Sequence, residues 1–199
     1  MAVIGITGGI ATGKSAFVRQ VCTLLPGAAF FDADSAARAL TSKDMEVRQL
    51  IAQTFGSEIY SAGGLNREAL RMIVFADPEK KRALEQILHP RIRRQWAAEA
   101  ERHRGPNEFF LADIPLLYET NGESLCDRVV VVACSAATQL QRLMARSSLS
   151  REAAAQMIAD QMPLTEKMKL ADHVIWNNGP EAALASQLKT LANLWRQAL

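Results

Sequence analysis

Residues 8 to 15 read Gly8-Gly9-Ile10-Ala11-Thr12-Gly13-Lys14-Ser15, which is the G-x-x-x-x-G-K-S pattern of a phosphate-binding loop. An apolar run, residues 2–6, comes directly before this loop, and an amphipathic stretch, residues 15–25, comes directly after it. A strand, the loop and a helix in this order are the context in which the pattern binds nucleotides. The sequence therefore predicts an α/β domain of the P-loop type that binds the phosphates of a nucleotide.

The chemistry of phosphate binding explains the residues of the loop. Backbone N–H groups must converge on a triphosphate, and Gly8 and Gly13 permit an approach that a β-carbon would obstruct. The helix that opens at Gly13 directs its unpaired N–H groups and the positive end of its dipole at the same anion. We expect Lys14 to reach the β- and γ-phosphates and the Ser15 hydroxyl to bind Mg²⁺.

The overall composition sets broad limits. A chain of 199 residues can form one domain with a buried core, residues 1–199, and its formal charge of +2 does not indicate a nucleic-acid partner. Cys22, Cys126 and Cys134 lack the spacing of a zinc site or a disulfide framework, which favours reduced thiols in the cytoplasm. No signal peptide and no apolar run of about 18 residues is found, so we expect neither secretion nor a membrane span. We expect a monomer or a weak homo-oligomer.

Short apolar runs alternate with helical material, which is the rhythm of a parallel sheet with crossover helices. The expected strands are Ala2–Ile6, Ala28–Phe31, Phe109–Ala112, Val129–Ala133 and His173–Trp176. The expected helices are Ser15–Leu25, Ser35–Leu40, Met45–Phe55, Arg67–Phe75, Glu79–Leu88, Pro90–His103, Ala136–Arg146, Arg151–Gln161 and Glu181–Gln197. Because proline interrupts helical hydrogen bonding, two of these helices should meet near Pro90.

Two intervals of the chain hold more helical sequence than a simple crossover needs. Residues 32–108 separate two expected strands, and charged amphipathic helices fill this interval, which predicts a helical insertion beside the sheet. Residues 141–171 are rich in Arg, Lys, Gln and Met, a composition typical of a mobile flap over the nucleotide.

Three aspartates follow expected strands, at the edge where parallel-sheet enzymes bind ligands. A carboxylate at Asp32 or Asp34 could orient or deprotonate an attacking hydroxyl, or Asp34 could simply cap the next helix. Asp113 ends another strand, where an acid of the Walker B type contacts Mg²⁺ or where an aspartate caps its own turn. The residues themselves leave both pairs of alternatives open.

Basic side chains gather in two places. Arg142 and Arg146 share one helix face, and Arg151 follows shortly after. Their guanidinium groups could stabilise charge on a transferring phosphoryl group, although most arginines on a helix surface only contact water. His89 precedes Pro90 and three arginines, a cluster that could recognise the anionic end of a second substrate, while a lone histidine is more often structural.

Together these segments resemble the dephospho-CoA kinase family from end to end. The motifs that carry the resemblance are Ile6-Thr7-Gly8-Gly9-Ile10 with Thr12-Gly13-Lys14-Ser15, Asp32-Ala33-Asp34 with Ala37-Arg38, Leu65-Asn66-Arg67, Leu84-Glu85-Gln86-Ile87-Leu88-His89-Pro90, Asp113-Ile114-Pro115-Leu116-Leu117-Tyr118-Glu119, Gln139-Leu140-Gln141-Arg142, and Ala171-Asp172-His173-Val174-Ile175 with Asn177-Asn178-Gly179. The loop alone would indicate only a superfamily, whereas these motifs in this order are specific to the family.

The resemblance implies a three-layer α/β/α fold with a five-stranded parallel sheet, a helical CoA subdomain at residues 57–105 and a helical lid at residues 142–161. It also implies transfer of the γ-phosphoryl group of ATP to the ribose 3′-hydroxyl of dephospho-CoA, the last step of coenzyme A biosynthesis. ATP and dephospho-CoA are then the substrates, and Mg²⁺ the cofactor.

The same resemblance implies roles for individual residues. Asp34 is the catalytic carboxylate, assisted by Lys14 and by Arg146 of the lid. The nucleotide-binding residues run from Gly8 through Ala16 and include Arg142. Asp34, His89 and Leu117 contact the acceptor, and Ser15 and Asp113 hold the metal.

Four positions depart from the usual family pattern. Ala11 stands where the family often has glycine, Ala16 where threonine is usual, Trp176 where aspartate is usual, and Met157 where many members have arginine. The first three remove no group that the mechanism requires, although Trp176 alters the packing near the adenine. We assign no catalytic role to Met157.

Two other functions remain to be weighed. Another P-loop kinase of small metabolites or nucleoside monophosphates would explain the loop, the carboxylates and the lid, but not the combined motifs. A regulatory switch of the GTPase type needs an Asn-Lys-x-Asp segment, which this chain lacks.

Overall fold

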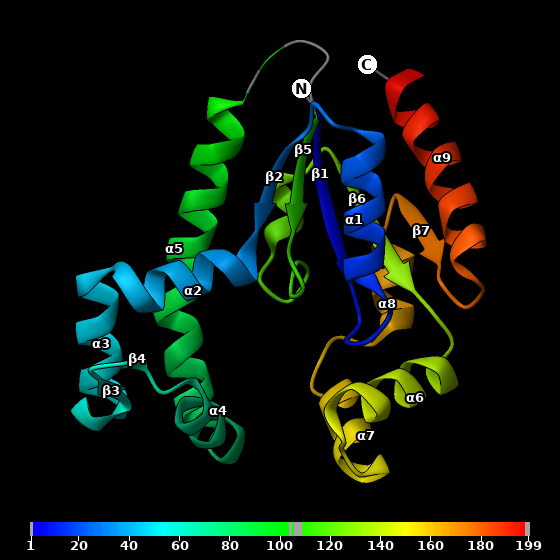
Figure 1. Cartoon of the computed structure of the whole chain (residues 1–199). Coiled ribbons are helices and arrows are strands. Elements are labelled where there is room, and N and C mark those ends of the chain that lie inside the picture. The colour runs from blue at the N-terminus through cyan, green and yellow to red at the C-terminus, as the bar shows by residue number, and fades with distance from the viewer. Residues whose placement is uncertain (1, 104, 106–108, 198–199) are drawn as a thin grey trace. The chain divides into compact units, whose positions relative to one another are not determined.

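A five-stranded parallel sheet organises the fold. The computed structural model describes residues 2–103, 105 and 109–197. The sheet has the order β2-β5-β1-β6-β7 and consists of β1 (Ala2–Gly8), β2 (Ala29–Asp32), β5 (Phe109–Asp113), β6 (Arg128–Ala133) and β7 (His173–Trp176) (Figure 1). The sequence prediction of five parallel strands is confirmed, and the predicted bounds of β7 match those observed.

Helices connect these strands. Those in the described residues are α1 (Lys14–Leu24), α2 (Ala33–Lys43), α3 (Met45–Phe55), α4 (Arg67–Ala76), α5 (Pro78–Arg102), α6 (Ala136–Ser147), α7 (Arg151–Ala159), α8 (Leu164–Leu170) and α9 (Glu181–Gln197). The shorter elements are the 3-10 helices η1 (Ser57–Ile59) and η2 (Gly122–Leu125) and the hairpin of β3 (Tyr60–Ser61) and β4 (Gly64–Leu65). Within the described ranges, no helix is both long and apolar enough to cross a membrane.

Strand register brings two predicted site segments to one edge of the sheet. The central strand β1 pairs with β5, where Ile6 lies opposite Asp113, and with β6, where Gly8 lies opposite Val132. Because all three strands are parallel, the loop after β1 and the acid that ends β5 emerge side by side.

The core explains why β6 is apolar from Val129 to Ala133, a run in which every residue is buried. Val130 and Val132 pack in one buried cluster with Phe17 and Val21 of α1 and Leu188 of α9. The helices α1 and α9 lie beside each other on this face of the sheet (Figure 1). Each such buried side chain contributes about 1.5–3 kcal/mol by leaving water, and the packing fixes where α1 begins beside the loop.

The chain forms two compact units, Met1–Phe31 with Glu99–Leu199, and Asp32–Ala98. The second unit has a hydrophobic cluster of its own, which consists of Leu40, Val47, Ile51, Phe55, Ile59 and Leu70. The insertion expected at residues 57–105 covers only part of this unit, because residues of α2 and α3 share the cluster with those of α4.

One sequence expectation about helices is wrong. Two helices were expected to meet near Pro90, but α5 continues through this proline from Pro78 to Arg102. Pro90 cannot donate to the carbonyl one turn before it. The Arg91 guanidinium donates to the Ile87 carbonyl at 3.0 Å, in the turn that contains the proline.

Candidate functional site

The N-terminus of α1 is built to meet an anion. Its N-cap is Gly13, which has a φ of 95° and no side chain, so no side-chain hydrogen bond caps this helix within the described structure. By contrast, Asp44, Ser135 and Ser150 cap α3, α6 and α7 with side-chain oxygens. The first N–H groups of α1 therefore remain available for a phosphate.

Close packing explains why glycines stand in the loop. A β-carbon at Gly13 would lie 2.0 Å from Asn177 Nδ2, and one at Gly8 would lie 2.5 Å from the Val132 carbonyl oxygen. The third special position is Ala11, which has a φ of 60° although it is not glycine. A left-handed conformation costs an alanine about 1 kcal/mol, so contacts around the loop must stabilise this backbone.

Hydrogen bonds within the loop and from other elements hold its Thr12 end. The Thr12 hydroxyl donates to the Gly9 carbonyl at 2.9 Å, and Asn177 Nδ2 donates to the Thr12 carbonyl at 2.9 Å. Arg142 Nη1 donates to the carbonyls of Thr12 at 3.3 Å and Asn177 at 2.9 Å. The predicted nucleotide-binding residue Arg142 is thus in direct contact with the loop backbone.

Lys14 forms an ion pair with Asp113. The sequence analysis expected Lys14 to bind the phosphates of ATP and Asp113 to bind Mg²⁺. The two side chains are 16% and 11% exposed, so water screens the pair only weakly. Ser15 lies next to them in α1, is exposed, and has no side-chain hydrogen-bond partner in the part of the chain that the structure describes. Ala16 follows in the same turn, and its N–H donates to the Gly13 carbonyl at 3.0 Å.

In the second unit, the structure separates the roles of Asp32 and Asp34. Asp32 is the N-cap of α2, and its carboxylate accepts from the Asp34 N–H at 2.9 Å and the Ser35 hydroxyl at 2.7 Å. The proposal that Asp34 caps this helix is therefore wrong. Asp34 lies exposed in the first turn of α2, and its carboxylate has no partner among the described residues.

The other predicted site residues differ in exposure. Arg146 and Arg151 are exposed, at the end of α6 and the start of α7. His89 is half-buried in α5, and burial lowers its pKa below the ordinary value, with a smaller opposing effect from Glu85. Leu117 is fully buried in the first unit, where it packs in the core and presents no surface to a ligand.

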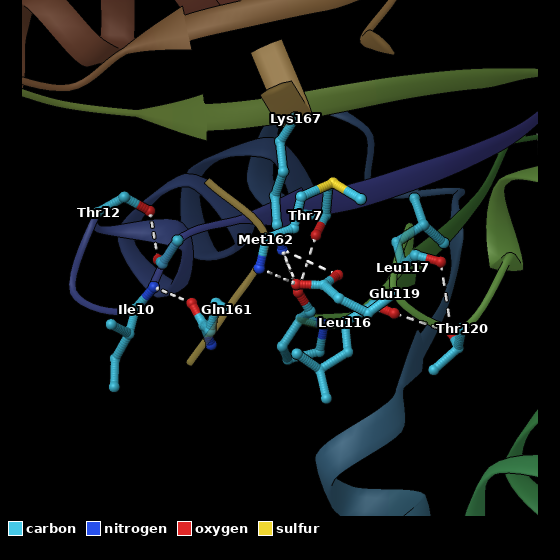
Figure 2. A network of polar contacts seen from close by, with 12 residues as sticks. Thr7, Ile10, Thr12, Leu116, Leu117, Glu119, Thr120, Gln161, Met162 and Lys167 are labelled. Carbon is cyan, nitrogen blue, oxygen red and sulfur yellow. Dashed lines mark hydrogen bonds and ion pairs between the residues drawn. The ribbon is translucent and has the colours of Figure 1, made fainter. Parts of the chain in front are cut away.

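The structure adds polar residues around the loop that sequence analysis did not assign. Gln139 Nε2 donates to the Ile10 carbonyl at 2.9 Å, and Gln161 Oε1 accepts from the Ile10 N–H at 2.9 Å. Lys167 is fully buried and pairs with Glu119 at 2.8 Å (Figure 2). Single glutamines and lysines carry no periodic signal, although Gln139 stands three residues before Arg142 and so shares its helix face.

Comparisons with known proteins agree with this geometry. Residues 2–182 match the family model described as dephospho-CoA kinase. The chain is 40% identical over 196 residues to a dephospho-CoA kinase of Bacillus anthracis, covering 97% of this chain and 96% of that protein. It is 41% identical over 203 residues to a dephospho-CoA kinase of Symbiobacterium thermophilum, covering 100% of this chain and 82% of that protein.

Solved structures show the same likeness. The dephospho-CoA kinase from Campylobacter jejuni has a TM-score of 0.66 and 28% identity, with 97% of this chain and 96% of that chain covered. A Thermus thermophilus protein has a TM-score of 0.77 and 36% identity, with 97% of both chains covered.

Proposed function

Because the chain belongs to the dephospho-CoA kinase family, its reaction is the ATP-dependent phosphorylation of dephospho-CoA, and we propose how its own residues divide that reaction. The γ-phosphoryl group of ATP passes to the ribose 3′-hydroxyl, which yields ADP and coenzyme A in the last step of coenzyme A biosynthesis. The observation that carries the proposal is the uncapped N-terminus of α1, with Lys14 in its first turn beside Asp113.

Phosphate binding falls to residues 8–16. The N–H groups at the start of α1 receive phosphate oxygens, and Lys14 exchanges its contact with Asp113 for the β- and γ-phosphates. Lys14 then stabilises the negative charge that develops on the transferring group. Ion pairing with Asp113 keeps the ammonium at the sheet edge before ATP arrives.

The residues at the same edge suit Mg²⁺. Ser15 and Asp113 offer a hydroxyl and a carboxylate, the oxygen donors that this ion prefers. No group of three or more His, Cys, Asp or Glu side chains suited to a metal occurs within residues 2–103, 105 and 109–197, so phosphate and water oxygens would complete the coordination. When bound, Mg²⁺ supplies charge neutralisation at the phosphates.

Asp34 is the proposed general base. A base must offer a free carboxylate to the acceptor hydroxyl, and the hydrogen bonds of Asp32 to the start of α2 leave that of Asp34 unused. Asp34 orients the ribose 3′-hydroxyl and takes its proton as the oxygen–phosphorus bond forms. Positioning and proton removal of this kind typically contribute about 10²–10⁴-fold to a rate.

The remaining assignments concern the lid and the acceptor. Residues 142–161 are the proposed lid, in which exposed Arg146 meets the phosphates and Arg142 steadies the loop. Residues 57–105 are the proposed acceptor subdomain, and half-buried His89 is its proposed contact. Leu117 supports this site through the core rather than by direct contact.

The three cysteines are free, which supports a reducing cytoplasmic compartment.

A second kinase reaction can be distinguished by its acceptor. A shikimate kinase from Acinetobacter baumannii has a TM-score of 0.52 and 15% identity to this chain, a likeness of fold alone. ADP release should be measured with dephospho-CoA, adenosine, AMP and shikimate as acceptors. We expect rapid release only with dephospho-CoA, and equal specificity constants for adenosine and dephospho-CoA would contradict the proposal.

A further inference from the structure

The polar groups of Ile10, in the middle of the phosphate-binding loop, are both held by glutamine side chains. The Ile10 N–H donates to Gln161 Oε1, and the Ile10 carbonyl accepts from Gln139 Nε2, each at 2.9 Å. These two groups belong to successive peptide bonds, so the two glutamines fix the orientation of the peptide planes on both sides of the Ile10 α-carbon. Neither glutamine belongs to the loop, although Gln161 is the last residue of the proposed lid.

The Gln139 contact lies where the loop is strained. The peptide that Gln139 holds joins Ile10 to Ala11, whose φ is 60°. Gln139 is 4% exposed, and a β-carbon at Gly9 would lie 2.6 Å from its amide nitrogen. Glycine at position 9 thus admits the amide that supports the left-handed backbone two residues later.

An ion pair between buried Lys167 and Glu119 supports the Gln161 contact. The next residue, Met162, donates its N–H to Glu119 Oε1 at 3.1 Å. Lys167 Nζ donates to Glu119 Oε2 at 3.1 Å and to the Pro115 carbonyl at 3.1 Å, which satisfies the buried ammonium (Figure 2). Figure 2 also shows Gln161 directed at Ile10 beside this network, and Pro115 stands two residues after Asp113.

The two glutamines also bracket the proposed lid. Gln139 lies in the first turn of α6, and Gln161 follows α7, so the chain between them leaves the loop and returns to the same residue. We propose that Gln139 and Gln161 are positioning residues of the kinase. They hold the loop in its phosphate-binding shape through Ile10 and fasten both ends of the lid segment to it. The inference deepens the proposed function and rests on it.

Gln139→Met and Gln161→Met test the proposal, with Gln20→Met as a matched control. Gln20 also makes a side-chain hydrogen bond, to Glu181 at 3.1 Å between α1 and α9. The measurements are Ile10 amide hydrogen exchange by NMR, the dissociation constant of ADP, and kcat and KM for ATP. ADP binding and exchange need no acceptor, so they decide this inference even if dephospho-CoA proves not to be the substrate.

We expect both variants to weaken ADP binding and raise the KM for ATP by about three- to tenfold, the size expected for one lost hydrogen bond, while Gln20→Met changes neither. Gln161→Met should also accelerate exchange of the Ile10 N–H without accelerating that of the β6 amides. A purely structural role would lower the melting temperature and leave ADP affinity intact. Folded variants with parental ADP affinity would therefore overturn the proposal.

A second variant tests the link to the strained backbone. Glycine adopts a positive φ without penalty, so Ala11→Gly should reduce the effect of losing Gln139. We expect Gln139→Met/Ala11→Gly to bind ADP more tightly than Gln139→Met alone, and no recovery would contradict support of Ala11 by Gln139. If Gln139→Met does not fold, half-exposed Gln161 carries the test.

Discussion

Replacing Lys14 with methionine separates the catalytic role of this residue from its structural one. Methionine keeps an unbranched apolar stem and removes the ammonium, so Asp113 loses its ion-pair partner. A hydrogen bond to a charged group contributes about 1.5–3 kcal/mol to stability. Because Asp113 retains another interaction, we expect a loss at the lower end of this range. For a chain of 199 residues, a loss of about 1.5 kcal/mol lowers the melting temperature by roughly 3–6 °C.

The effect on catalysis should be larger. Loss of one preorganised donor to a developing negative charge costs about 2.7–4 kcal/mol, or about 10²–10³-fold in kcat. ADP release in the presence of saturating dephospho-CoA measures this rate, and thermal unfolding without ligand measures stability. A variant that keeps more than a tenth of the parental kcat would refute the assignment of Lys14 to the transferring phosphate.

A double variant provides the control. In an Asp113→Asn background Lys14→Met no longer removes an ion pair, so it should cost less stability there than in the parent, by about 1 kcal/mol. The catalytic loss should remain, because the ammonium is still absent. Equal stability costs in the two backgrounds would show that the ion pair contributes nothing to the fold.

Two further predictions concern ionisable groups that are at least partly buried. Lys167→Met removes the ion pair to Glu119, whose carboxylate stays partly exposed and keeps the Met162 N–H, so the free energy of unfolding should fall by about 1.5–3 kcal/mol in urea titrations. A change below about 0.5 kcal/mol would contradict this. Burial lowers the pKa of His89 and of His173, so the unfolded chain gains protons at higher pH than the folded chain. The stabilisation from these neutral histidines should therefore be fully present above about pH 6.5, and the free energy of unfolding should fall as the pH drops below that value. His89→Asn should reduce the slope of that fall. Identical slopes for parent and variant would contradict the role of His89.

Local patterns were sufficient to predict much of the fold. The bounds expected for α3 and α9 match those observed, because both helices have an apolar period and, for α3, Asp44 caps its first turn. The phosphate-binding loop could also be predicted from a local pattern, because consecutive residues form the loop. The prediction at Pro90 was wrong, because α5 continues through a proline at which the local rule would end a helix.

The remaining contacts depend on residues far apart in the chain. Lys14 meets Asp113 only because the register of β1 and β5 aligns their ends, and no local pattern encodes that register. Asp34 was considered as a cap because the helix was expected to begin at Ser35, whereas α2 begins at Ala33 and Asp32 caps it; helix starts are the feature that sequence patterns locate least well. Gln139 and Gln161 bind backbone rather than side chains, so their positions follow no spacing rule.

The most direct test of the account compares Asp34→Asn with Asp32→Asn in single-turnover transfer of the γ-phosphoryl group to dephospho-CoA. Asparagine caps a helix about as well as aspartate, so neither variant should lose α2, and ATP affinity should change little in both. The account predicts that Asp34→Asn slows transfer by about 10²–10⁴-fold, while Asp32→Asn has a much smaller effect. Parental transfer by Asp34→Asn, or loss of transfer by Asp32→Asn alone, would contradict it.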